Sequence, residues 1–129
     1  MADLKEKSIS LISSTTGIDA KTVATTVLYT VPTGKSLIVD HVVIRVTGFD
    51  AGAKGVQAVA SFGGNAATYD DYLNTVTYTV AAADVFIRDS VDDSALPIYA
   101  AASSFRISIE TGSDATTETW AVDVFGYLI

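Results

Sequence analysis

The chain has 129 residues, of which 49% are hydrophobic, and it carries a net charge of −7 and no cysteine. This length fits one domain, the apolar fraction excludes intrinsic disorder, and the lack of cysteine excludes disulfides, thiolate metal sites and cysteine nucleophiles. The acidic balance argues against nucleic acid, because phosphate binding depends on Lys and Arg. No apolar run approaches the roughly 20 residues of a membrane helix, so we expect no membrane partner.

The polar start of the chain, residues 1–8, lacks the basic and apolar regions of a signal peptide, so we expect synthesis in a cytoplasm. Short segments with β-strand alternation then follow one another. A turn is predicted at residues 32–35 (PTGK), and a loop at 63–74 with a helical turn around 69–73 and a backbone turn at Gly63-Gly64. The predicted strands cover residues 8–13, 25–31, 36–47, 56–62, 76–80, 85–89, 95–99, 105–110 and 120–129.

Eight or nine strands at a spacing of roughly 8–12 residues, without a long helical period, predict an all-β fold. Eight strands in two sheets favour a two-sheet β-sandwich that is jelly-roll-like, in a single domain. The predicted inner core consists of Val27, Tyr29, Val31, Val76, Tyr78, Val80, Phe105, Ile107, Ile109, Trp120, Val122 and Val124.

Two predicted strands are apolar on both faces. In residues 36–47 one face carries Ile38, Asp40, Val42, Ile44 and Val46, and the other carries Leu37, Val39, His41, Val43 and Arg45. In the last strand Phe125, Tyr127 and Ile129 stand opposite Trp120, Val122, Val124 and Leu128. A sandwich has one inner face per sheet, so these second faces require cover from loops, from the N-terminal segment or from a neighbouring subunit. The pattern leaves the three alternatives open.

Residues 1–24 are interpreted as an N-terminal arm with a first strand, and residues 25–129 as the sandwich. Charged residues precede Ile9 and Leu11, so we expect residues 1–16 to become ordered only against a partner, by adding a strand to its sheet. The alternative is that residues 8–13 form an ordinary strand of the chain's own sandwich. The residues predicted to contact a partner are Ile9, Leu11, Val39, His41, Val43, Phe125 and Tyr127.

The sequence offers no catalytic constellation, cofactor motif or metal site. His41, the single histidine, follows Asp40, but neighbours on a strand point to opposite faces, so we expect a packed or interface histidine and no dyad. The pairs Asp70-Asp71 and Asp92-Asp93, with Asp89, could bind calcium if two loops met, but they lack the EF-hand pattern, and we expect solvated loop acids.

Two segments and a loop carry a resemblance. Residues 27–35 (VLYTVPTGK), residues 122–128 (VDVFGYL) and the loop FGGNAATYDDY at 62–72 resemble segments of small virion proteins of tailed bacteriophages. The resemblance spans most of the chain beyond Thr25. It implies a jelly-roll-like sandwich, often trimeric, displayed on a virion, and it supplies no catalytic residues.

The first functional hypothesis is therefore a capsid decoration (cement) protein on the outer shell, a homotrimer whose partners are its own copies and the major capsid protein. The alternative is a tail or receptor-binding component that binds carbohydrate or a host surface. For this alternative the residues of a sugar site would be Tyr69, Tyr72, Tyr78, Asp70 and Asp71, although the core position predicted for Tyr78 argues against its part in the site. A small enzyme is the least favoured hypothesis.

Overall fold

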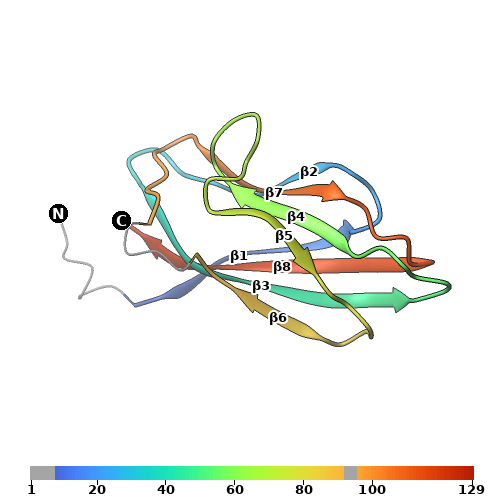
Figure 1. Ribbon diagram of the computed structural model, residues 1–129. Helices are drawn as coiled ribbons and strands as arrows, with labels where there is room; N and C mark the ends of the chain where they lie inside the picture. The colour runs from blue at the N-terminus through green and yellow to red at the C-terminus, as the bar shows by residue number, and fades with distance from the viewer. Residues whose placement is uncertain (1–7, 92–95) are drawn as a thin grey trace.

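The computed structural model describes residues 8–91 and 96–129, which contain eight β-strands and no helix. Figure 1 shows the strands stacked in two layers. Their bounds are β1 Ser10–Asp19, β2 Thr25–Thr30, β3 Leu37–Asp50, β4 Ala58–Gly63, β5 Leu73–Tyr78, β6 Phe86–Asp89, β7 Ser104–Thr111 and β8 Thr117–Leu128. The all-β prediction is confirmed.

The strands form two antiparallel sheets of four, in the orders β1-β8-β3-β6 and β2-β7-β4-β5. Successive strands alternate between the sheets, apart from the β4–β5 pair, which lies within one sheet. This order is that of an eight-stranded jelly roll, so the predicted sandwich architecture is also confirmed. The loops β1–β2, β3–β4, β5–β6 and β7–β8 gather at one end of the sandwich (Figure 1).

The core lies between the two sheets and is rich in aromatic rings. Trp120, Phe62 and Phe105 are fully buried, and the ring of Tyr78 meets both Phe62 and Trp120 edge-on. The core predictions for β7 and β8 are confirmed, as are Val31, Tyr78 and Val80. In β2 the prediction was wrong, because an irregularity between Val27 and Tyr29 turns Leu28 inward and leaves Val27 41% exposed. Tyr29 and Val76 are partly buried against the core.

A second irregularity changes the two faces of β3. The pairing with β8 shifts between Val39 and His41, so Asp40 is an extra residue and the alternation of faces is interrupted. Leu37 and Val39 therefore join the core, whereas Ile38 pairs with Tyr127 on the outer side of the sheet. The predicted faces were right after the bulge and inverted before it.

The first strand belongs to the chain's own sandwich. β1 pairs with β8 from Ser10 to Asp19, and Ile18 at its end is buried against the core. The expectation that residues 10–16 are ordered only against a partner was therefore wrong, and the alternative, an ordinary strand, holds for them. Residues 8 and 9 are exposed and precede the strand, and residues 1–7 lie outside the described residues.

The loop predicted after β4 is present, but its detailed structure differs from the prediction. Its turn covers residues 66–68, no helical turn forms at 69–73, and Leu73 already begins β5. Asn65 causes this shape, because its Oδ1 accepts the backbone N–H groups of Asp70 and Asp71. Gly63 ends β4, and only Gly64 belongs to the loop. Of the strand predicted at 95–99, residue 95 lies outside the described residues, and residues 96–99 contribute one bridge, between Leu37 and Tyr99.

Candidate functional site

Apolar side chains from three strands meet on the outer face of the β1-β8-β3-β6 sheet. Phe125 of β8 pairs with Leu11 of β1 on one side and with His41 of β3 on the other. Directly paired residues in antiparallel strands share a face, so the three side chains form a row across the sheet. The rings of His41 and Phe125 are stacked, with centroids 4.6 Å apart and an angle of 7° between their planes.

The neighbouring rows extend this surface. Val43 lies two residues beyond His41 on the same face, and Tyr127 lies two residues beyond Phe125. Ile9 lies just before β1 begins, two residues ahead of Leu11. Leu11 is 55% exposed and Ile9 46%, while the other side chains are half-buried. We call this surface the outer patch, and it consists of Ile9, Leu11, His41, Val43, Phe125 and Tyr127. Val39, which was also predicted to contact a partner, is excluded because it is 1% exposed in the core.

The charged groups beside the outer patch are paired with one another. Arg45 donates two hydrogen bonds to Asp123, from Nε at 2.8 Å and from Nη2 at 3.0 Å, and Ser14 Oγ donates a third at 2.6 Å. The bond to Asp123 raises the pKa of Arg45. Burial raises the pKa of Asp123, but the bonds from Arg45 and Ser14 outweigh it, and the pKa lies below its ordinary value.

The bulge in β3 also brings His41 and Asp40 together. His41 Nδ1 donates to Asp40 Oδ2 at 2.8 Å, and Arg88 Nη2 lies 3.8 Å from the same oxygen. The prediction that these two neighbours cannot pair was wrong, because it assumed regular alternation through a position where the strand is irregular. The hydrogen bond to Asp40 fixes the His41 ring against Phe125. Residues 8–91 and 96–129 form no pocket in which the pair could act on a ligand. The contacts of His41 are those of a packed surface histidine within the outer patch.

The outer face of the second sheet has a different character. Its cross-strand pairs are mainly hydroxyl side chains, Thr25 with Ser108 and Thr30 with Ser104, and the Oγ1 of Thr30 lies 3.3 Å from the Oγ of Ser104. Val27 is the one exposed large apolar side chain within the described strands of this sheet. The described strands of the first sheet expose two such side chains, Leu11 and Phe86, and Leu11 lies beside the half-buried ring of Phe125.

The proposed sugar-binding combination does not form. Tyr72 and Tyr78 are each 3% exposed in the core. Burial raises the pKa of Tyr72 to about 12, and burial with a hydrogen bond to Asp89 raises that of Tyr78. Tyr69 remains at the surface, where the Arg106 guanidinium lies 4.8 Å from its ring centroid. Buried tyrosine rings cannot pack against a sugar, so the aromatic part of that prediction was wrong.

The loop carboxylates serve the fold. Asp71 Oδ1 accepts from the Gly64 N–H and from the Tyr99 hydroxyl, both at 2.9 Å. Hydrogen bonds from Asn65 and then Thr68 lower the pKa of Asp70. Asp92 and Asp93 lie outside the described residues. Among those described, no three His, Asp or Glu side chains gather as metal ligands.

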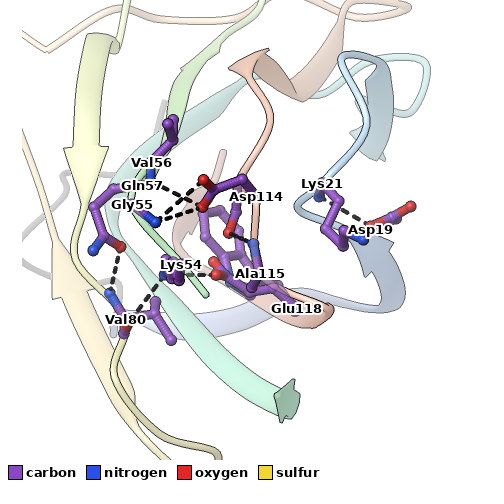
Figure 2. A network of polar contacts seen from close by, with 12 residues as sticks. Asp19, Lys21, Lys54, Gly55, Val56, Gln57, Val80, Asp114, Ala115 and Glu118 are labelled. Carbon is purple, nitrogen blue, oxygen red and sulfur yellow. Dashed lines mark hydrogen bonds and ion pairs between the residues drawn. The ribbon is translucent and has the colours of Figure 1, made fainter. Parts of the chain in front are cut away.

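Sequence reasoning missed a buried ion pair at the loop end of the sandwich, shown in Figure 2. Lys54 Nζ donates to Glu118 Oε1 at 2.9 Å and to the Val80 carbonyl at 2.9 Å, and the two charged side chains are 6% and 0% exposed. The other oxygen of Glu118 accepts from Trp120 Nε1 at 3.0 Å. Glu118 is thus satisfied on both oxygens, and the β3–β4 loop is held to β8. One signal in the sequence could have indicated that Glu118 is buried. The alternation of β8 places Glu118 on the same face as Trp120, which was predicted to lie in the core.

A second tie fixes the same loops to one another. Asp114 in the β7–β8 loop accepts from the N–H groups of Gly55 and Val56 in the β3–β4 loop, each at 2.9 Å (Figure 2). These backbone bonds lower the pKa of Asp114, with that from Val56 the strongest contribution. Lys21 of the β1–β2 loop donates to the Thr116 carbonyl at 3.0 Å. Since Lys54 also bonds the Val80 carbonyl in the β5–β6 loop, all four loops at this end are cross-linked.

Comparisons of the chain with family models, with curated proteins and with solved structures find no match. In the described part of the chain, no helix is long and apolar enough to cross a membrane.

Proposed function

We propose that the chain is a structural protein of a tailed-phage virion, a decoration protein that binds the outer capsid shell as a homo-oligomer and stabilises it. The observation that carries the proposal is the outer patch. Exposed Leu11 and half-buried Phe125, Tyr127 and Val43 lie together on one sheet face, and a gathered apolar surface of this kind is typical of a protein contact.

The body behind the patch supports a structural role. A jelly roll with cross-linked loops presents its sheet faces rigidly, so a contact costs little ordering entropy. Its net charge of −7 favours solubility at high copy number. Two of the six residues of the outer patch, Phe125 and Tyr127, lie within VDVFGYL, one of the segments that resemble phage virion proteins.

The decoration role is preferred to that of a tail or receptor-binding component. The carbohydrate hypothesis depended on three tyrosines beside Asp70 and Asp71, and two of these rings, those of Tyr72 and Tyr78, are in the core. No observation on the described residues favours it further.

Copy number in purified virions tests the proposal. Quantitative mass spectrometry, with the major capsid protein of the same particles as the internal standard, should give hundreds of copies per particle. A few copies per particle would indicate a tail component instead. Absence of the chain from virions would overturn the proposal.

A further inference from the structure

We propose that the outer patch is covered by a second copy of this chain, so that it is the self-association surface of the oligomer and not the surface that grips the shell. This inference rests on the proposed function and names the partner of its site. It separates two contacts that a decoration protein needs, one between its own copies and one with the capsid.

Charge is the first argument for a second copy. The chain carries −7 overall, so two copies repel one another across most of their surface. On the outer face, Arg45 is paired with Asp123, while Asp40 accepts from His41 and lies near Arg88. Positive and negative groups are balanced there, which makes this face a place where identical acidic copies can approach without net repulsion.

Symmetry is the second argument. Around a closed two-fold or three-fold axis, residues near the axis meet their own equivalents, so the surface must be compatible with itself. Apolar side chains such as Leu11 and Phe125 meet this requirement, and the ion pair of Arg45 and Asp123 is already satisfied within one chain. No charge has to find a partner across the contact.

The size of the face fits a contact of ordinary area. Four strands at about 4.8 Å spacing, with β8 rising about 3.3 Å per residue, give a face of at most roughly 760 Å². A stable interface covers about 800 Å² on each partner. The contact would therefore use nearly the whole outer face, including the exposed Phe86 of β6 at its edge.

Analytical ultracentrifugation of matched variants tests the inference. We expect the wild type to sediment as a multiple of 13.5 kDa at micromolar concentration. Leu11→Ser and Phe125→Ser should each raise the dissociation constant at least tenfold. Val27→Ser is the control, because it removes an exposed apolar side chain from the outer face of the other sheet and should leave assembly unchanged. Urea unfolding shows whether each variant is folded. If Phe125→Ser fails to fold, Leu11→Ser still tests the inference, because the Leu11 side chain is 55% exposed and its replacement should leave the fold intact.

Three results would overturn the inference: a wild type of 13.5 kDa at all concentrations, a Leu11→Ser variant that assembles like the wild type, or equal loss of assembly in Val27→Ser. Its failure is distinguishable from that of the proposed function. A chain abundant in virions but bound there as isolated monomers contradicts only the inference. A chain that self-associates through the patch but is absent from virions contradicts only the virion role.

Discussion

Replacing Lys54 by Met removes the ammonium of the buried ion pair while keeping an unbranched side chain of similar length. Glu118, fully buried, would then keep only the hydrogen bond from Trp120 Nε1. Breaking a buried pair by removing one partner costs about 3–5 kcal/mol, because an uncompensated charge stays in the interior. Since a domain is stable by about 5–15 kcal/mol, this single change should remove a large share of the free energy of unfolding.

Urea unfolding at pH 7, followed by the fluorescence of the single Trp120, measures the loss. A second variant, Glu118→Gln, and the double variant complete a thermodynamic cycle. Glutamine keeps an acceptor for Trp120 but carries no charge, so the loss of Lys54 no longer leaves a buried charge unpaired. The double variant should therefore be more stable, by at least about 2 kcal/mol, than the sum of the two single losses predicts.

The pair of Arg45 and Asp123 provides the matched control. Its shortest bond is 2.8 Å against 2.9 Å for the buried pair, but its side chains are 30% and 15% exposed. Arg45→Met should therefore cost about 1 kcal/mol or less. If Lys54→Met costs no more than Arg45→Met, or if the cycle is additive, the argument that burial makes Lys54 and Glu118 interdependent is wrong.

Three further predictions concern pH and packing. The pKa of Asp123 is lowered in the fold, so the stability that its ionised form contributes is present above the unfolded pKa of about 3.9 and is lost as the pH falls. The urea midpoint of the wild type should therefore exceed that of Asp123→Asn at pH 7, and this difference should shrink at pH 3. The pKa of Tyr78 is raised, so the stability that its protonated hydroxyl contributes is lost as the pH rises above about 10. The free energy of unfolding of Tyr78→Phe should therefore fall less steeply above this pH than that of the wild type. A Cβ on Gly126 would collide with the backbone at Ile38, so Gly126→Ala should cost about 1–3 kcal/mol in urea unfolding, whereas Gly48→Ala, in ordinary contact with Thr119, should be close to neutral.

Periodicity predicted the fold well because the inner faces of β7 and β8 alternate without interruption. It failed where a strand is irregular. The bulge at Asp40 inverted the faces before it, which moved Val39 into the core and joined His41 to Asp40. The irregularity at Leu28 had the same effect in β2. A bulge depends on pairing with another strand, and a single sequence does not display that pairing.

The outer patch was predictable in part for the same reason. Phe125, Tyr127 and Val43 were identified because both faces of their strands are apolar, and register alone decides that Leu11 lies beside Phe125. The ion pair of Lys54 and Glu118 was not predictable, because Lys54 reaches it from a loop 64 residues away in sequence. Long side chains from loops follow no period.

A cryo-EM map of the virion would show whether the chain is a shell protein whose copies meet through the outer patch. We expect jelly-roll density on the outer capsid surface, clustered so that the β1-β8-β3-β6 faces of neighbouring copies are in contact, with Leu11 and Phe125 buried between them. Copies that stand apart with this face in solvent, or that turn it toward the capsid shell, would show that the outer patch is not the self-association surface.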